Sequence, residues 1–369
     1  TRSRMRTTMR VATSGFPWRH LAASRRLAPL SRHKTTIRSP HDRGESEESD
    51  ATTPFNPDEL CEQALARGIR SKGIERAVWS EIRADAVAQS REQSWRTLDL
   101  HEFGIDNFLT REVLNHMSLA CGLAFGVGGK LSANGRIGGG IDYEKIFLSA
   151  FRAEPGLCTS VAADLLRFKE VDPACPNMLG VYLFYKGVKA LACARVAGHY
   201  WRRRGDAGKL IARLLQSEGS DMFGVDIHPG AKLGDGITID HATGVVIGET
   251  SVIGDNVYIM HDVTLGATGT SDYFDRHPKI GAGTFLGAKC TVLGNIEVGK
   301  GATVAASALV NKPVPPGYTA VGVPAKLIPP PKSSEYWKPE LAVNSAELTG
   351  GRQRHFERFR QTFSGKVML

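Results

Sequence analysis

Four histidines, His228, His241, His261 and His277, fall within one stretch of the chain. Imidazole titrates near neutral pH, so each could act as a general base, and each could also bind a metal ion. Asp226 lies 15 residues before His241, and a carboxylate beside an imidazole can fix its tautomer and stabilise its protonated form. For His241 the alternative is a plain surface histidine. The residue types therefore allow proton transfer or metal binding and do not choose between them.

No pattern in the sequence indicates a zinc ribbon, a covalent intermediate or a Walker phosphate loop. The six cysteines are scattered without a CxxC pair, and Cys290 is expected to be packed. The segment Gly126–Gly140 is rich in glycine, but Leu131 follows Lys130, which does not fit a Walker A motif. Its composition predicts a flexible loop. We expect no metal ion.

An aliphatic residue recurs at every sixth position over much of the C-terminal half. The positions form three runs, with a slip of two residues after the first run and a longer interruption after the second. They are Ile227, Leu233, Ile239, Val245, then Ile247, Ile253, Ile259, Leu265, and then Ile280, Leu286, Val292, Val298, Val304 and Val310. A period of six belongs neither to a helix nor to an alternating strand. It is the hexapeptide repeat of a parallel β-helix, in which three flat sides make a coil of about 18 residues.

The chain ahead of the repeat has the apolar spacing of helices. This spacing is clear in Ala77–Gln93, Asn107–Leu123, Tyr143–Phe151, Ser160–Phe168 and Leu179–Arg203. The prediction is therefore an α + β chain, with an all-α domain at 58–220 and a β-helix at 221–328. A cluster of prolines that begins at Pro313 ends the regular repeat, because proline cannot donate to a β-ladder. The polar residues 329–369 form a C-terminal tail.

The positive charge of the chain is concentrated at one end. The formal net charge is +9, from 47 Lys and Arg against 38 Asp and Glu, and residues 1–41 hold ten of the basic residues and no acid. This Arg-rich, Ser-rich segment has the composition of an organelle transit peptide, and an acidic linker follows at 42–57. A basic arm that binds nucleic acid is the alternative. We expect a mitochondrial protein, with the plastid as the alternative, and no nucleic-acid partner.

No run of 18 apolar residues occurs, so the sequence predicts no membrane-spanning helix.

Long stretches in and before the repeat are more specific than the period itself. They are GVDIHPGAKLGDGITIDHATGVVIGET (Gly224–Thr250), DRHPKIG (Asp275–Gly281), LGNIEVGKGA (Leu293–Ala302), PVPPGYTAVGVPAKLI (Pro313–Ile328) and, upstream, VDPACPNMLGVYLFYKGVKALACARVAGHYW (Val171–Trp201). Together they resemble the serine O-acetyltransferase family, closely over 171–328 and loosely over 77–168. The resemblance implies a left-handed β-helix and transfer of acetyl from acetyl-CoA to the hydroxyl of L-serine. This reaction is the first step of cysteine biosynthesis from serine, and the resemblance implies direct attack with a histidine base.

The resemblance also implies a role for individual residues. His241 of IDHATG matches the general base, and Asp226 matches its partner carboxylate. The residues that match the serine-binding positions are Asp172 and Asp240 for the ammonium group, and Arg276 and His277 for the carboxylate. Those that match the CoA-binding positions are Gly287, Ala288, Ala306 and, with less specific support, Lys326. His228 and His261 match no assigned role, and His261 could line the site or only stack there.

The resemblance implies a homotrimer, with a dimer of trimers, the hexamer typical of the family, as the alternative. Some members also dock into O-acetylserine sulfhydrylase (cysteine synthase) through their C-terminal tail. Such members usually end in isoleucine, and this sequence ends in Leu369. We expect the same partner through residues 329–369.

Two other functions fit parts of the sequence. A metal-dependent hydratase on the same β-helix would use three histidines at subunit interfaces, and the four histidines supply enough imidazoles. A non-catalytic subunit would keep the β-helix and bind cysteine synthase through the tail. The motifs IDHATG and DRHPK and the intact pair of Asp226 and His241 favour the acetyltransferase over both.

Overall fold

The computed structural model describes residues 73–91, 105–134, 140–175, 177–203, 205–269 and 274–330. The chain divides into two units, Thr1–Pro54 and Phe55–Leu369, and every described residue belongs to the second. The predicted transit peptide, the linker and residues 331–369 of the predicted tail lie outside the described residues. No helix in the described ranges is long and apolar enough to cross a membrane.

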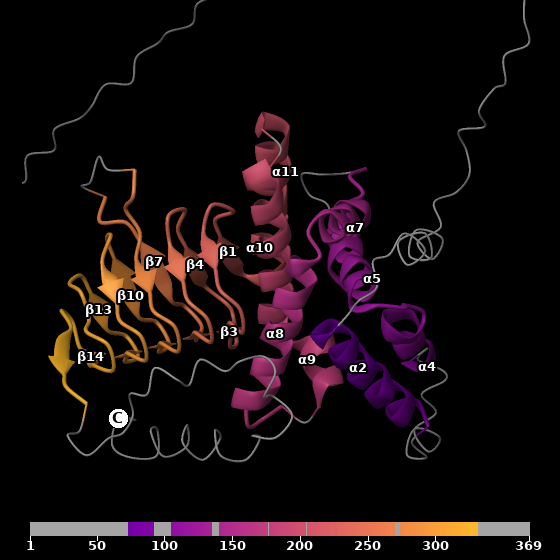
Figure 1. Cartoon of the computed structure of the whole chain (residues 1–369), viewed down its shortest axis with the longest axis horizontal. Helices are drawn as coiled ribbons and strands as arrows, with labels where there is room; N and C mark the ends of the chain where they lie inside the picture. The colour runs from indigo at the N-terminus through magenta and orange to yellow at the C-terminus, as the bar shows by residue number, and fades with distance from the viewer. Residues whose placement is uncertain are drawn as a thin grey trace, which may run out of the picture. The chain divides into compact units, whose positions relative to one another are not determined.

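The first part of the described chain is helical. Its helices are α2 (Ile74–Ser90), α4 (Ile105–Leu109), α5 (Leu119–Leu123), α6 (Lys130–Asn134), α7 (Tyr143–Ala153), α8 (Gly156–Val171), α9 (Met178–Phe184), α10 (Lys186–Arg203) and α11 (Gly205–Phe223), with π-helical turns η1 (Thr110–Leu114) and η2 (Ala124–Gly129). Side-chain caps begin several of them; Asp142 accepts from the backbone N–H of Lys145, and Asn177 from that of Gly180. Helices α10 and α11 form a long antiparallel pair (Figure 1).

The prediction of a flexible loop at Gly126–Gly140 is wrong over its first part. Residues 126–129 lie in η2 and residues 130–134 in α6. A Cβ at Gly128 would lie 2.9 Å from the backbone of Glu144, so this glycine allows η2 to approach α7 closely. Glycine at this position allows two helices to pack closely. A glycine-rich composition is the same for such a packed helix as for a flexible loop, so composition alone could not distinguish them.

Short parallel strands follow the helices and form three sheets. The five-stranded sheet has the order β1-β4-β7-β10-β13, the four-stranded sheet β11-β8-β5-β2, and the six-stranded sheet β15-β14-β12-β9-β6-β3. The strands are β1 (Val225–Ile227), β2 (Lys232–Leu233), β3 (Thr238–Ile239), β4 (Val245–Ile247), β5 (Val252–Ile253), β6 (Tyr258–Ile259), β7 (Thr264–Gly266), β8 (Lys279–Ile280), β9 (Phe285–Leu286), β10 (Thr291–Leu293), β11 (Glu297–Val298), β12 (Thr303–Val304), β13 (Leu309–Val310), β14 (Thr319–Val321) and β15 (Lys326–Ile328). Successive strands enter the three sheets in turn, which makes a β-helix, and the predicted fold class is confirmed.

The strand register gives the coil length and shows where the repeat is interrupted. Thr291 pairs with Leu309, 18 residues later, as the hexapeptide period predicts. Val225 pairs with Val245, so the first coil has two extra residues, which lie between β3 and β4. Val252 pairs with Lys279, so another coil has nine extra residues, which lie between β7 and β8. Both interruptions carry residues that the sequence analysis assigned to the site.

The interior of the β-helix is a stack of the repeated aliphatic residues. Ile239, Ile259 and Leu286 are fully buried and lie in paired strands of successive coils. Among the described strands one pair is antiparallel, β14 with β15, and it closes the six-stranded sheet at its far end.

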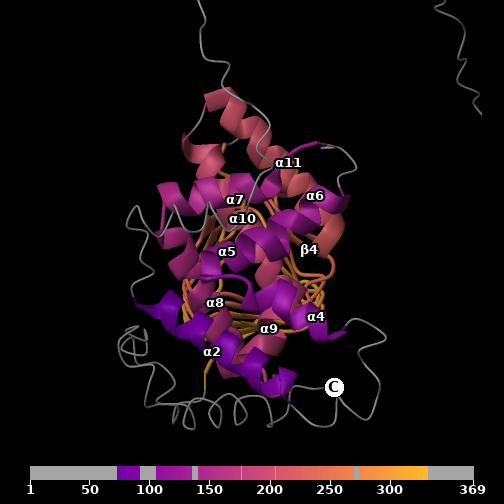
Figure 2. The ribbon, with the colours of Figure 1, turned by 90° about the vertical axis from the view of Figure 1, so that its right-hand side faces the viewer.

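The helices pack against the first coil and position its corners. Helix α11 contacts β1, and α10 contacts β3; Figure 2 shows the helices in front of the coils. A Cβ at Gly187, in α10, would lie 2.0 Å from the carbonyl oxygen of Ile239. Glycine is therefore required where α10 meets the end of β3, directly before Asp240 and His241.

Candidate active site

His241 lies on the corner that joins the six-stranded sheet to the five-stranded sheet. The two extra residues of the first coil are in this corner, and both His241 and Ala242 have left-handed backbone angles, with φ of 55° and 60°. Non-glycine residues rarely adopt such angles, but Asp262, Lys289 and Ser307 adopt them on the same edge in the following coils, so the angle is a feature of this type of corner. The imidazole is 71% exposed, and its Nε2 is 3.8 Å from Oδ2 of Asp240. The corner therefore presents a histidine to solvent beside a carboxylate.

Two carboxylates and two tyrosines gather next to His241. Tyr258 donates a hydrogen bond of 2.9 Å to Oδ2 of Asp240, and Tyr185 donates one to Asp172. Burial and, after it, the bond to Asp172 raise the pKa of Tyr185 to about 12. Burial and Asp240 likewise raise the pKa of Tyr258. Both tyrosines are therefore neutral donors, and the two carboxylates form a negative patch that suits an ammonium group.

Arg276 and His277 lie on a different edge, at the end of the nine-residue insertion between β7 and β8. This edge joins the five-stranded sheet to the four-stranded sheet. Nη2 of Arg276 is 3.3 Å from Oε2 of Glu249. The ring of His277 is 7% exposed and lies against Gly248, where a Cβ would be 2.0 Å from its Cδ2.

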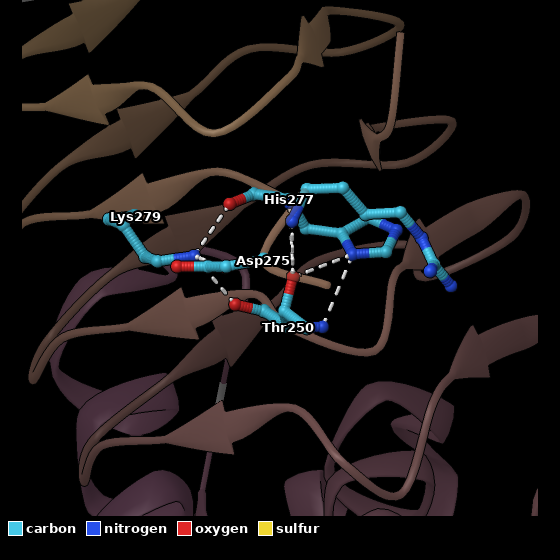
Figure 3. Close-up of polar contacts among 5 residues, drawn as sticks. Thr250, Asp275, His277 and Lys279 are labelled. Carbon is cyan, nitrogen blue, oxygen red and sulfur yellow. Dashed lines mark hydrogen bonds and ion pairs between the residues drawn. The ribbon is translucent and has the colours of Figure 1, made fainter. Parts of the chain in front are cut away.

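Thr250 and Lys279 connect this insertion to the preceding coil (Figure 3). The hydroxyl oxygen of Thr250 accepts from the backbone N–H groups of Arg276 and His277, at 3.0 and 3.1 Å. The ammonium of Lys279 donates to the carbonyl oxygens of Thr250 and His277, each at 2.8 Å, and to Oδ1 of Asp275 at 2.6 Å. The backbone that carries Arg276 and His277 is thus held at both ends.

The ionisation of His277 is set by its surroundings. Burial lowers its pKa, and the positive charge of Arg276 lowers it further. The imidazole is therefore neutral near pH 7, so the guanidinium of Arg276 supplies the positive charge of this edge and His277 supplies a neutral hydrogen-bond donor.

Asp226 lies in the middle of β1, and its Oδ1 accepts a hydrogen bond of 2.7 Å from the side chain of Gln216 in α11. Both Asp226 and His241 are described, and no hydrogen bond or ion pair joins them within this single chain. The 15-residue spacing suggested that they could meet around a corner. Their pairing therefore stays a prediction.

Two of the residues matched to CoA binding, Ala288 and Ala306, lie on the same edge as His241. His241, His261, Ala288 and Ala306 each come two residues after the strand of the six-stranded sheet in four successive coils. The rings of His241 and His261 meet edge to face, with centroids 5.7 Å apart. Beyond them, only alanine side chains stand at this position, which leaves an open path along the edge for an extended ligand.

Gly287 has a structural reason to be glycine. A Cβ there would lie 2.6 Å from the backbone nitrogen of Ala306 in the next coil. Its missing side chain therefore allows two coils to approach each other. Lys326 is exposed in β15, at the far end of the six-stranded sheet.

His228 occupies the edge of Arg276, two coils earlier. Its Nδ1 accepts from the backbone N–H of Gly230 at 3.0 Å, and its ring lies edge-on against Trp201, with centroids 5.0 Å apart. Burial lowers the pKa of His228. A neutral, packed imidazole with one nitrogen already in use is a structural residue. Among the described residues, no three His, Cys, Asp or Glu side chains are grouped so that they could hold a metal ion.

Comparison with known proteins bears on the helical part and on the repeat. The family model of the serine acetyltransferase N-terminal region matches residues 78–193, and the model of six bacterial transferase hexapeptide repeats matches residues 277–312. Serine acetyltransferase 2 of Arabidopsis thaliana is 41% identical over 266 residues, which cover 72% of this chain and 77% of the relative. The chain belongs to the serine acetyltransferase family.

Solved serine acetyltransferase structures have the same fold. That of the soybean enzyme complexed with serine is 41% identical, has a TM-score of 0.61 and covers 70% of this chain and all of its own. A serine acetyltransferase in complex with CoA is 36% identical, has a TM-score of 0.61 and covers 69% of this chain. The predicted activity is confirmed: the reaction transfers acetyl from acetyl-CoA to the hydroxyl of L-serine.

Because the chain belongs to the serine acetyltransferase family, the site is that of an acetyltransferase. It is not explained as the site of a metal-dependent hydratase or as part of a non-catalytic subunit. Three residues around the site were not expected from the sequence, namely Tyr185, Tyr258 and Thr250. Tyr185 and Thr250 lie within the stretches that resemble the serine acetyltransferase family. Tyr258 precedes a buried repeat position by one residue, so its side chain points out of the coil, but that signal does not say which group it meets.

Proposed function

We propose that His241 is the general base of the acetyl transfer. A serine hydroxyl is a weak nucleophile near neutral pH and needs a base that removes its proton as it attacks. The imidazole would take this proton while the oxygen adds to the thioester carbonyl carbon of acetyl-CoA. The intermediate then breaks its C–S bond, and the imidazolium returns the proton to the departing thiolate of CoA. The single observation that carries this proposal is the exposed His241 on a left-handed corner, beside a carboxylate and on the edge lined by alanines.

We propose that the acetyl group passes directly to serine in a ternary complex, without an acyl-enzyme. Cys158, Cys193, Cys175 and Cys290 are free cysteines in the described part of the chain. Burial raises the pKa of Cys193 and of Cys290 to about 12. Their thiols stay protonated at neutral pH, and the thiolate is the nucleophilic form. The buried thiols of this chain are therefore poor acyl acceptors.

We propose that the two edges of the β-helix bind opposite ends of serine. Asp240, on the edge of His241, and Asp172, at the end of α8, suit the ammonium group. The other edge carries Arg276 and His277, and a guanidinium suits a carboxylate through paired hydrogen bonds. One amino acid is too short to bridge two edges of one β-helix. We infer that the site forms in a homotrimer, where one subunit supplies His241 and its neighbour supplies Arg276.

Subunit mixing tests this arrangement and the function together. Chains that carry His241→Asn and chains that carry Arg276→Ala are expected to be nearly inactive alone. When the two are co-expressed in equal amounts, about a quarter of the sites would pair an intact His241 with an intact Arg276. Release of the CoA thiol in the presence of serine is the measurement. Activity that does not exceed that of the two parents would show that the two residues do not meet across subunits.

Tyr258 is proposed to hold Asp240 in place for the ammonium group of serine. Tyr258→Phe removes the hydroxyl and keeps the ring that stacks on Phe285, at a centroid distance of 5.3 Å. Loss of one hydrogen bond to a carboxylate is expected to raise KM for serine about tenfold, with little change in KM for acetyl-CoA. Tyr318→Phe, in the last coil, is the matched control and should leave both constants unchanged. An unchanged KM for serine in Tyr258→Phe would contradict the role.

We also propose that residues 1–41 direct the protein to the mitochondrion, with the plastid as the alternative, and that residues 329–369 contact cysteine synthase. The arginine-rich, acid-free composition of the first segment supports the former. The family resemblance supports the latter.

A further inference from the structure

The side chain of Thr250 joins the insertion before β8 to the preceding coil, in addition to the contacts of Lys279 and Arg276 with that coil. Its hydroxyl oxygen accepts from two backbone N–H groups, those of Arg276 and His277. Both lone pairs of the oxygen are then in use, so its own hydrogen is free to be donated. Nδ1 of His277 lies 2.9 Å away and is the acceptor for it.

A second donor confirms which nitrogen of His277 carries the proton. The backbone N–H of Thr250 also points at Nδ1, at 3.2 Å, and a backbone N–H can only donate. Nδ1 must therefore be the unprotonated nitrogen of the neutral ring, and Nε2 must carry the hydrogen. Within the described residues Nε2 has no hydrogen-bond partner, so its N–H is available to a ligand.

The geometry points to Thr250 as a positioning residue that fixes His277 in the Nε2–H tautomer and aims that N–H, beside the guanidinium of Arg276, at the substrate carboxylate. This inference rests on the proposed roles of Arg276 and His277 in binding the carboxylate. It adds that the hydroxyl of Thr250 orients both residues. Thr250 itself touches neither substrate. It acts through the two backbone N–H groups it accepts and through the ring nitrogen it faces.

The alternative tautomer is strongly disfavoured in this arrangement. A hydrogen on Nδ1 would face both the backbone N–H and the hydroxyl of Thr250. The hydroxyl could turn away only by giving up a backbone N–H that it accepts. The hydroxyl of Thr250 therefore holds the backbone of Arg276 and His277 and also donates to Nδ1. A side chain of the same shape without a hydroxyl would do neither, and only the backbone N–H at position 250 would still face Nδ1.

The matched pair Thr250→Val and Thr250→Ser tests the inference in the full-length chain. Valine keeps the branched shape and removes the hydroxyl, and serine keeps the hydroxyl. Thr250→Val is expected to raise KM for serine about tenfold, because two backbone N–H groups lose their acceptor. KM for acetyl-CoA should not change, and kcat should change by less than about threefold. Thr250→Ser should restore KM for serine to near the parent value.

Nitrogen NMR of histidine-labelled protein gives a readout that does not depend on activity. The signal of His277, assigned from its loss in His277→Asn, is expected to show the Nε2–H tautomer in the parent and in Thr250→Ser. In Thr250→Val it should show a detectable minor fraction of the Nδ1–H tautomer, because the hydroxyl donor to Nδ1 is lost and only the backbone N–H remains. An Nδ1–H tautomer in the parent, or an unchanged tautomer and KM in Thr250→Val, would overturn the inference.

The variants His277→Asn and Thr250→Val distinguish a failure of this inference from a failure of the proposed serine-binding role of His277. If His277→Asn leaves KM for serine unchanged, His277 does not bind the carboxylate, and the proposed function is wrong at that residue. If His277→Asn raises KM for serine while Thr250→Val changes neither KM nor the tautomer, the proposed function stands and the role of Thr250 is wrong.

Discussion

Replacement of His241 by asparagine is expected to lower kcat about a thousandfold, the typical contribution of a positioned general base. The proton of the serine hydroxyl would then have no acceptor as the oxygen attacks the thioester. Asparagine is preferred to alanine because position 241 has a φ of 55°, and asparagine tolerates this left-handed conformation better than most residues. The measurement is kcat for release of the CoA thiol at saturating serine and acetyl-CoA.

The control for this variant lies one coil further along the same edge. Asp262 is exposed and has a φ of 56°, so Asp262→Asn makes a comparable change in the same type of corner. It should keep the parent kcat. Both variants should unfold at the parent temperature, because the His241 side chain is 71% exposed and packs little. A His241→Asn protein with kcat within a few fold of the parent would remove His241 as the base.

The interruptions of the repeat carry more functional information than the repeat itself. A regular coil of 18 residues turns its corners with small residues and leaves few groups for chemistry. The two-residue slip proved to be the corner of His241, and the longer interruption proved to be the insertion that ends in Arg276 and His277. The six-residue period predicted the β-helix. The two interruptions of the period marked the corner and the insertion that carry the proposed site residues.

Contacts between distant parts of the chain could not be predicted in the same way. Gln216 reaches Asp226 from α11, and Tyr258 reaches Asp240 from the next coil. Both contacts depend on which outward-facing side chains meet, and the hexapeptide period constrains only the inward ones. The prediction of a flexible loop at residues 126–129 was wrong for a related reason. Composition does not reveal that another helix packs against these glycines.

The helical domain has a direct effect on the site through a buried ion pair. Arg195 of α10 donates to both carboxylate oxygens of Asp164 in α8, at 2.8 and 2.9 Å. The same guanidinium donates to the carbonyl oxygen of Gly234, and Asp164 accepts from the backbone N–H of Ile237. Both contacts are to the first coil, which ends in the corner of His241. The ion pair of Asp164 and Arg195 thus connects α8, α10 and the first coil.

Asp164→Ala is expected to lower the free energy of unfolding by about 3–5 kcal/mol, because it leaves the guanidinium of Arg195 buried and unpaired. Asp164 is fully buried, and the side chain of Arg195 is 5% exposed. The measurement is the denaturant midpoint and slope at a fixed protein concentration. The pair Arg167 and Glu170, both 19% exposed, is the control, and Glu170→Ala should cost less than about 1 kcal/mol.

A double variant separates loss of an ion pair from loss of packing. Asp164→Leu with Arg195→Met removes both charges and keeps much of the volume, so it should be more stable than Asp164→Ala. It should not reach the stability of the parent, because Ile237 and Gly234 each lose a buried hydrogen-bond partner. An Asp164→Ala protein destabilised by less than about 1 kcal/mol would mean that water reaches Arg195. In that case the ion pair would not be what holds the first coil, and the corner of His241, against the helices.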